Sequence, residues 1–263
     1  MADEQNEYTL ESGYHLHFQS AGEGAVRTVL VHGWGTTSNI WSSVLSRWPL
    51  GAGRVIALDL RGVGWSSKPA DGYTLQGWAD DLTGVLAQLP EPPILVGHSM
   101  GGTICQLLAT QHPALIRRLV LVSPVPAGGV PLSDADVAYF RSLAGHRAGM
   151  ASVLRSMMAA PPAESVVEQL ISDSASVLPA AFIQGLDAWR AADFADRLAD
   201  IQAPTAVLGG ALEQPLTPDI LQAAVVALIP GATFTLLPGV GHYPQLESPD
   251  HFTDTLLRAC QLS

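Results

Sequence analysis

The chain has 263 residues, a length that suits one α/β domain with a sizeable core. Its 13 Lys and Arg residues are outnumbered by 24 Asp and Glu residues, and the net charge of −11 removes the electrostatic basis for binding a nucleic-acid backbone. Charged residues make up 14% and hydrophobic residues 48%, which excludes a disordered chain and predicts a large buried interior.

The first half of the chain alternates strand-like and helix-like segments. Apolar and polar residues alternate from Tyr8 to Gln19 around Ser12-Gly13, which predicts a β-hairpin at an antiparallel edge of a sheet. Four apolar runs then have the composition of strands buried on both faces: Thr28–Val31, Arg54–Leu58, Pro93–Val96 and Leu119–Val122. Helix-length segments lie between them: Ser38–Trp48, Leu75–Leu89 and Gly101–His112. This order predicts an α/β fold with a mostly parallel sheet.

The alternation stops after Val122 and resumes near residue 205. The intervening residues are rich in Ala, Met, Leu and Ser and contain helical patches: Asp134–Leu143, Ala148–Ala159, Ser165–Ile171 and Pro179–Arg190. Beyond them, two strands and two helices are predicted: Thr205–Leu208, Pro218–Leu228, Thr233–Leu237 and Pro249–Cys260. The sequence therefore predicts a core of residues 1–125 and 193–263, with a helical cap of residues 126–192 inserted in it.

The segment Gly97-His98-Ser99-Met100-Gly101-Gly102 follows a predicted buried strand and opens a predicted helix. In this context, Gly-x-Ser-x-Gly is typical of a nucleophile elbow, in which a serine lies on a strained strand-to-helix turn. Side chains in place of the flanking glycines would collide with the strand or helix. The helix start also supplies free N–H groups and a positive dipole end. Ser99 is therefore the predicted nucleophile.

His32-Gly33-Trp34-Gly35 ends the first buried run, where a loop can bring a backbone N–H toward Ser99. We predict that the N–H groups of Trp34 and Met100 form a two-donor oxyanion hole, and that the Trp34 side chain also lines the pocket. The alternative interpretation is a tight turn with a packing tryptophan.

Gly239-Val240-Gly241-His242-Tyr243-Pro244 follows the last predicted strand. A histidine on such a loop can reach the serine and act as general base and then as general acid, so His242 is the predicted base. His32 and His98 are better interpreted as residues that orient the loop and the elbow. Surface or structural positions explain the other five histidines better: His15, His17, His112, His146 and His251.

A further motif follows the second buried run: Asp59-Leu60-Arg61-Gly62-Val63-Gly64-Trp65-Ser66, which is similar to a D-x-R-G-x-G-x-S segment. Together with the motifs around Trp34, Ser99 and His242, it resembles the α/β-hydrolase superfamily, and the resemblance extends from about Thr28 to the C-terminus. The similarity extends to serine carboxylesterases, enol-lactonases and pimeloyl carrier-protein methyl ester esterases. The resemblance implies an α/β-hydrolase fold and cofactor-free hydrolysis of a small ester, lactone or thioester through an acyl-enzyme on Ser99. Serine at the elbow disfavours the relatives that use an aspartate nucleophile.

The chain departs from the family at the acid of the triad. The family pattern is Gly-x-x-Asp followed by a short run ending in Pro, and residues 209–218 hold one residue too many. Counting forward from Gly210 places Glu213 at the acid position, whereas counting back from Pro218 places Gln214 there. A glutamate can accept the histidine Nδ1–H and stabilise the imidazolium ion, but a glutamine carries no charge.

Two other positions for the acid are weaker candidates. Asp219 opens a predicted helix, and capping explains it. The second acid position used in the family, after Leu119–Val122, holds Ser123-Pro124 and no carboxylate. Glu213 is therefore the predicted acid, with Gln214 as the alternative.

The predicted cap carries apolar side chains that can line an acyl pocket or pack the cap against the core: Val137, Phe140, Leu143, Met150, Met157, Met158, Phe182 and Trp189. For each residue taken alone, packing is the favoured interpretation. Arg141, Arg147 and Arg155 give no clear clamp for an anionic substrate, which favours a neutral or hydrophobic one.

The remaining expectations concern cofactors, partners and location. Cys105 and Cys260 are predicted to be buried thiols, and no Cys/His cluster indicates a metal, so no cofactor and no metal are expected. The acidic, polar first seven residues differ from a signal peptide and favour a cytoplasmic location. The expected partner is a small-molecule substrate, with no nucleic acid and no membrane, and the composition permits a monomer or a homodimer.

Two alternative functions stay open at this point. The irregular acid loop also fits a lyase, C–C bond hydrolase, cofactor-free oxygenase or cyclase of the same fold, because proton abstraction can tolerate a weaker triad. The third class is a ligand-binding receptor that retains Ser99 and His242 but turns over slowly.

Overall fold

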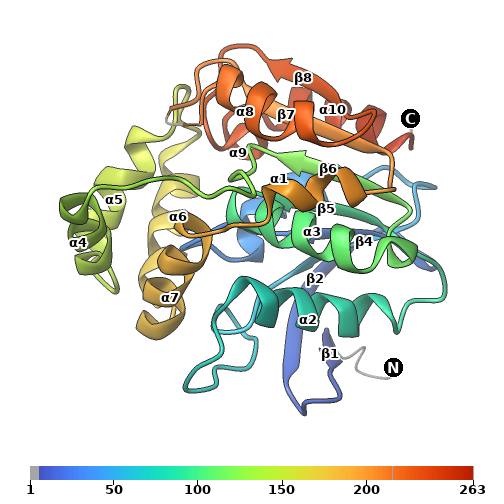
Figure 1. Cartoon of the computed structure of the whole chain (residues 1–263), viewed down its shortest axis with the longest axis horizontal. Helices are drawn as coiled ribbons and strands as arrows, with labels where there is room; N and C mark the ends of the chain where they lie inside the picture. The colour runs from blue at the N-terminus through green and yellow to red at the C-terminus, as the bar shows by residue number, and fades with distance from the viewer. Residues whose placement is uncertain (1–5, 215, 263) are drawn as a thin grey trace.

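A computed structural model describes residues 6–214 and 216–262, and within these ranges eight strands form one sheet in the order β1-β2-β4-β3-β5-β6-β7-β8 (Figure 1). β1 pairs antiparallel with β2, β2 pairs antiparallel with β4, and all other pairs are parallel. The strand bounds are β1 Glu7–Thr9, β2 His15–Ala21, β3 Val26–Val31, β4 Arg54–Leu58, β5 Ile94–His98, β6 Arg118–Val122, β7 Thr205–Gly210 and β8 Thr233–Leu237. The predicted hairpin and parallel strands are thereby confirmed.

Helices cover both faces of the sheet. α2 (Leu75–Leu86) packs against α3 (Met100–Gln111), and α1 (Ser42–Leu45) packs against α10 (Pro249–Cys260). Every residue of β5 and β7 is buried, as the apolar runs of a parallel sheet require. The sheet directs the carboxyl ends of its parallel strands toward one edge, where ligands usually bind in open α/β sheets.

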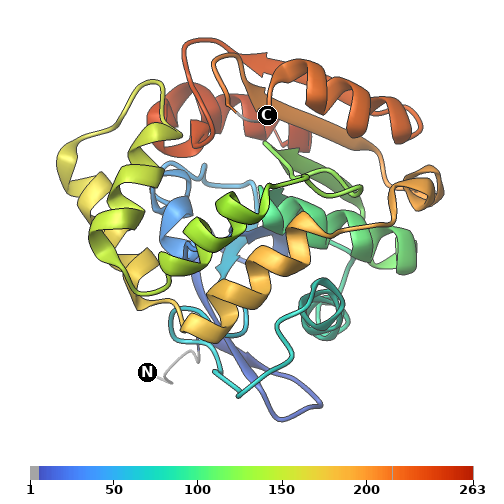
Figure 2. The same ribbon diagram turned by 60° about the vertical axis from the view of Figure 1, so that its left-hand side comes forward.

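Four helices lie between β6 and β7: α4 Asp134–Ser142, α5 Arg147–Ser156, α6 Glu164–Ser176 and α7 Pro179–Arg190. Figures 1 and 2 show these helices gathered at one end of the sheet. α5 packs against α6, and α4 packs against α7. Ser133 and Asp136 form a capping box that starts α4. We call residues 126–192 the α4–α7 segment.

Two predicted helices end earlier than expected because polar groups elsewhere form hydrogen bonds with their backbone. The segment predicted as one helix, Ser38–Trp48, consists of a 3₁₀ helix, η1 (Ser38–Trp41), followed by α1. The Ser38 N–H donates to Asp59 Oδ1 at 2.8 Å and the Thr37 hydroxyl caps η1, contacts that compete with a regular α-helix. α5 ends at Ser156 instead of Ala159, since the following residues turn toward the loop of His242.

Other bounds differ less. α6 runs on to Ser176, and the predicted Pro218–Leu228 helix is divided into α8 and a 3₁₀ turn. The elements that the sequence did not predict separately are short: η2 Pro113–Leu115, η3 Ala195–Asp200, α8 Pro218–Ala224, η4 Val226–Leu228 and α9 Pro244–Glu247.

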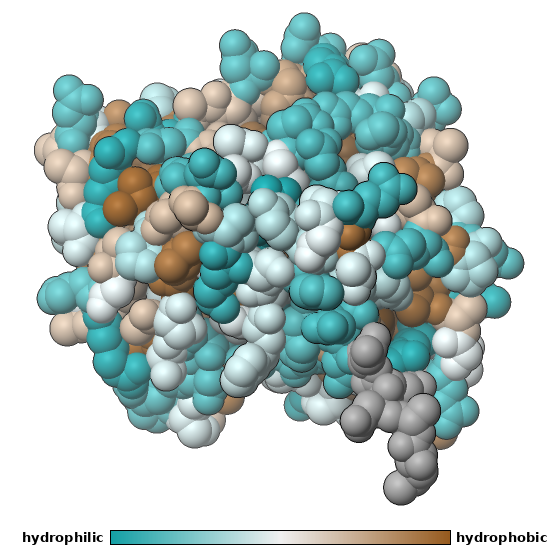
Figure 3. Space-filling view, turned by 90° about the horizontal axis from the view of Figure 1, so that it is seen from below, coloured by the Kyte–Doolittle hydropathy of each residue, from teal (hydrophilic) through white to brown (hydrophobic). Residues whose placement is uncertain are grey.

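The surface seen in Figure 3 mixes hydrophilic and hydrophobic residues, with the hydrophobic ones in small groups. Both cysteines are free and buried, as predicted. In the described part of the chain, no single helix has the length and apolar composition to cross a bilayer, although α6 and α7 would together meet that criterion despite a 97° bend between them.

Candidate active site

Ser99 lies on a strained turn at the carboxyl end of β5. Its φ of +53° and ψ of −122° belong to a region that residues other than glycine rarely adopt. A Cβ on Gly97 would lie 2.6 Å from the Gly101 carbonyl oxygen, and a Cβ on Gly101 would lie 2.4 Å from the His32 carbonyl oxygen. The structure thus confirms the steric reason for both glycines and presents Ser99 at the start of α3.

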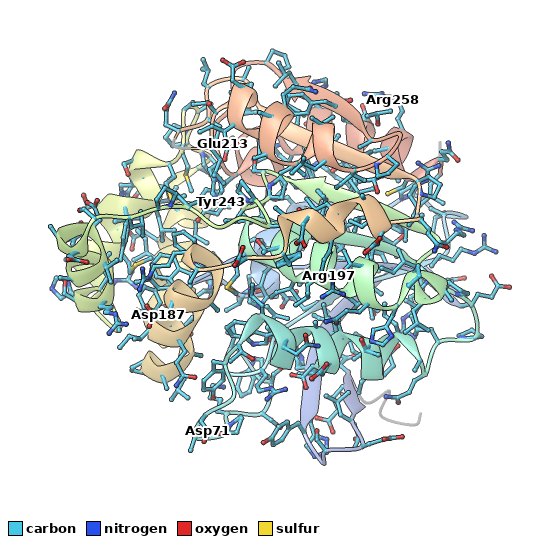
Figure 4. The ribbon with its side chains drawn as sticks, in the orientation of Figure 1. Asp71, Asp187, Arg197, Glu213, Tyr243 and Arg258 are labelled. Atoms are coloured by element: carbon cyan, nitrogen blue, oxygen red, sulfur yellow. The ribbon has the colours of Figure 1, made fainter. Side chains whose placement is uncertain are left out.

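His242 and Glu213 form a buried hydrogen-bonded pair on the loops after β8 and β7. His242 Nδ1–H donates to Glu213 Oε1 at 2.6 Å, and the residues are only 2% and 0% exposed. Figure 4 places Glu213 and the neighbouring Tyr243 where the sheet meets the α4–α7 segment. The structure therefore brings Glu213 to His242, whereas Gln214 lies exposed on the wall of a cavity.

Ser123 is a partner of this pair that the sequence did not reveal. Its hydroxyl donates to Glu213 Oε2 at 2.6 Å, so each carboxylate oxygen has a short hydrogen bond. Ser123 follows β6, is fully buried and has a φ of +43°. The sequence marked this position for its lack of a carboxylate, and the structure shows a donor to the carboxylate there instead.

The loop after β3 lies against the Ser99 turn. A Cβ on Gly33 would lie 3.0 Å from the Ser99 Cβ, a tight contact, so glycine favours this close approach. Met100 is the first residue of α3, and its N–H has no acceptor within the helix. The His32 ring holds the loop, since Nδ1–H donates to the Gly33 carbonyl and Nε2 accepts the Leu60 N–H. Burial lowers the pKa of His32, which agrees with this neutral tautomer.

The Trp34 side chain joins this loop to the α4–α7 segment. Its Nε1–H donates to the Phe182 carbonyl at 2.7 Å, and its ring lies against those of Phe140, Phe182 and Trp189. It also lines the cavity above Ser99, so the contribution to the pocket predicted for this side chain is confirmed.

His98 fixes the backbone of His242. Its Nε2–H donates to the His242 carbonyl at 2.8 Å within the buried interior. Burial, with a smaller contribution from the neighbouring His242, holds the pKa of His98 well below its usual value of 6.5. His98 is therefore a neutral donor, in line with the orienting role predicted for it.

A cavity of about 500 Å³ connects Ser99 and His242 with the α4–α7 segment. Of the cap side chains named from the sequence, Phe140, Met150, Met157 and Trp189 line it. The other four are not part of the wall. Leu143, Met158 and Phe182 are buried in packing, and Val137 is half-buried. Apart from His242, the lining residues that the structure describes include no Lys, Arg, His, Asp or Glu.

The arginines of the α4–α7 segment form ion pairs at the surface. Arg141 pairs with Asp187, and Arg147 pairs with Glu168 at 2.5 Å. Arg155 pairs with Glu164. These pairings agree with the expectation that the arginines do not clamp a substrate.

Asp59 organises the loop that follows β4. Its carboxylate accepts hydrogen bonds from the Ser38 N–H at 2.8 Å and from His17 Nδ1–H at 3.2 Å. Burial opposes its ionisation, but these hydrogen bonds prevail and lower the pKa of Asp59 to about 2. A Cβ on Gly64 would lie 2.0 Å from its Oδ2. The Asp59–Ser66 motif therefore has a structural role, which is to hold the fold of this loop.

Within residues 6–214 and 216–262, no group of three or more His, Cys, Asp and Glu side chains could hold a metal ion. The site brings together the Ser99 hydroxyl on a strained turn, a buried His–carboxylate pair and the free N–H of Met100, which are the kinds of group that acyl transfer uses.

Comparisons with known proteins agree with this geometry. A family model described as "Alpha/beta hydrolase family" matches residues 28–254. A pimeloyl-[acyl-carrier protein] methyl ester esterase of Pectobacterium carotovorum is 30% identical over 94% of this chain and 98% of its own. A 2-hydroxymuconate semialdehyde hydrolase of Pseudomonas putida is 30% identical over 92% and 89%. An esterase structure from Exiguobacterium antarcticum has a TM-score of 0.89 at 24% identity, covering 97% of this chain and 99% of that one. The predicted fold class is confirmed.

Proposed function

The chain belongs to the alpha/beta hydrolase family, and on that premise we propose that it is a cofactor-free serine hydrolase that cleaves a small, neutral ester, lactone or thioester. One observation carries the proposal. The buried Glu213–His242 pair and the strained Ser99 both belong to loops at the carboxyl edge of the sheet, and Ser99 and His242 line one apolar cavity.

In the proposed reaction, His242 Nε2 takes the Ser99 hydroxyl proton while Ser99 Oγ attacks the carbonyl carbon. The Nδ1–H bond to Glu213 leaves Nε2 as the acceptor and stabilises the imidazolium ion. The Trp34 and Met100 N–H groups hold the oxyanion, as proposed from the sequence. Collapse releases the alcohol or thiol, which takes the proton from His242. Water activated by His242 then hydrolyses the acyl-enzyme.

The cavity supports a neutral or hydrophobic acyl group. Its volume of about 500 Å³ lies within the usual range of small-molecule sites. The apolar wall also includes Leu132, Val153, Leu154 and Leu216, and the described wall residues include no Lys or Arg to neutralise a substrate carboxylate. We assign the α4–α7 segment the role of a cap that closes over the cavity and selects the acyl group.

A panel of nitrophenyl esters from acetate to dodecanoate tests this function. We expect turnover that depends on acyl length, loss of turnover in Ser99→Ala, and labelling of Ser99 by a serine-reactive phosphonate, located by mass spectrometry. Ser174→Ala is the matched control, because it removes a buried serine hydroxyl away from the cavity. Turnover that survives in Ser99→Ala would refute the proposal.

The semialdehyde hydrolase relative raises a second candidate, cleavage of an anionic hydroxymuconate-type substrate. The described residues of the cavity wall include no Lys or Arg to pair with a substrate carboxylate, which disfavours this candidate. Turnover of such a substrate by a protein that cleaves no ester would favour this candidate. Thermal stabilisation by esters without any turnover would instead favour the receptor class.

A further inference from the structure

Glu247, in α9, collects four backbone N–H groups on one carboxylate. Its Oε2 accepts from Ala159 at 2.8 Å, from Ala160 at 2.9 Å and from Gly241 at 2.9 Å. Its Oε1 accepts from Tyr243 at 2.9 Å. Hydrogen bonds to an ionised acceptor are about twice as strong as neutral ones, so this is a firm junction between chain segments.

The donors come from two separate parts of the chain. Ala159 and Ala160 follow α5 of the α4–α7 segment, whereas Gly241 and Tyr243 flank His242 on the loop after β8. A direct bond adds to this junction, because the His242 N–H donates to the Met157 carbonyl at 3.0 Å.

The junction is tight as well as polar. A Cβ on Gly241 would lie 2.6 Å from the Met157 carbonyl oxygen and 3.0 Å from the Ala159 nitrogen. Met157 also lines the cavity. A shift of this wall therefore moves the backbone that carries the general base.

Glu247 is not explained as half of a surface ion pair. Among the described residues, no Lys, Arg or His forms a salt bridge with Glu247, and its carboxylate accepts hydrogen bonds from backbone N–H groups alone. Its charge is therefore used to hold two loops together.

We propose that Glu247 is a positioning residue that fixes the His242 loop to the end of α5, so that the acyl-cavity wall and the general base are held as one unit. This inference rests on the proposed hydrolase function. It explains why the chain does not continue α5 to Ala159, since the Ala159 and Ala160 N–H groups donate to Glu247. The residue acts through His242 and touches no substrate atom.

Glu247→Gln tests the proposal, because glutamine keeps the shape but places an NH₂ group against at least one N–H donor. We expect kcat per titrated Ser99 to fall about 10- to 100-fold, as small misplacements of reacting groups do, with KM for a short-chain ester changed less than about three-fold. Glu247→Asp keeps the charge but is one methylene too short to reach both loops. Its kcat per titrated Ser99 should lie between that of wild type and that of Glu247→Gln. Glu168→Gln is the control, because it removes a carboxylate that pairs with Arg147 at the surface.

Hydrogen exchange supplies the second readout. In Glu247→Gln we expect faster amide exchange in both residues 157–163 and residues 240–247. In Glu168→Gln we expect the wild-type exchange rate in both segments. Wild-type kcat per titrated Ser99 in Glu247→Gln, or lost activity explained fully by fewer titratable sites, would overturn the proposal. Failure of the hydrolase function is a separate outcome, since wild type would then cleave no ester while the exchange result still reports on the junction. If Glu247→Gln does not fold, the same two criteria apply to Glu247→Asp.

Discussion

Ser123→Ala removes the donor that holds the second oxygen of Glu213. The bond is 2.6 Å long, Ser123 and Glu213 are both 0% exposed, and no solvent can replace the lost donor. Alanine keeps the Cβ, so the backbone strain at φ +43° stays nearly unchanged. Hydrogen bonds to charged groups contribute about 1.5–3 kcal/mol, so unfolding should become easier by that amount. For a chain of this size, this corresponds to a Tm lowered by about 3–12 °C.

Thermal and urea unfolding measure this loss, and kcat per titrated Ser99 shows whether Glu213 still orients His242. We expect kcat to fall although Ser99 stays fully titratable. Ser174→Ala is the matched control, since Ser174 is 1% exposed and its hydroxyl has no hydrogen-bond partner in the described part of the chain. Removing an unsatisfied hydroxyl should cost little or stabilise. The reasoning is refuted if both variants lose equal stability, or if Ser123→Ala unfolds like wild type.

Three further changes test other parts of the account. Gly101→Ala places a Cβ 2.4 Å from the His32 carbonyl oxygen and should lower the free energy of unfolding in urea by at least about 1–3 kcal/mol. In the control, Gly84→Ala, the new Cβ meets only the end of a leucine side chain, so the free energy of unfolding should change by no more than about 1 kcal/mol. The pKa of Asp59 lies at about 2, below its unfolded value, so its ionised form should add about 2 kcal/mol of stability above pH 4, and this stability should disappear as the pH falls toward 2. Asp59→Asn should abolish this part of the pH dependence. A pH profile of unfolding that is the same in Asp59→Asn and wild type would contradict this prediction. Val153→Trp narrows the cavity and should raise KM for long acyl esters about ten-fold or more while sparing acetate; an equal effect on all chain lengths would contradict the assignment of the acyl site.

Local sequence patterns were sufficient to predict the sheet and to place two candidate site residues at its carboxyl edge. The strands β3 to β7 are buried on both faces, so their apolar runs are distinctive. Ser99 and His242 lie on glycine-rich loops directly after strands, and the fold brings such loops to one edge. Spacing along the chain was therefore enough to name both residues.

Contacts between distant segments could not be predicted in this way. Ser123 and Glu213 are 90 residues apart, and the hydrogen bond between them leaves no local signal. The same is true of the end of α5, which depends on Glu247, 88 residues beyond Ala159. The choice between Glu213 and Gln214 depended on a loop with one extra residue, and only side-chain direction separates the two. Periodicity reports burial, whereas these features depend on polar partners elsewhere in the fold.

The central claim is that Glu213, through His242, activates Ser99. The most direct test is kcat per titrated Ser99 for wild type, Glu213→Gln and Gln214→Ala on one short-chain nitrophenyl ester. Replacing the carboxylate of a triad by an amide typically lowers kcat by about 10⁴-fold, and we expect a loss of that order in Glu213→Gln, with Gln214→Ala within a few-fold of wild type. Wild-type turnover in Glu213→Gln, or a loss confined to Gln214→Ala, would contradict the account.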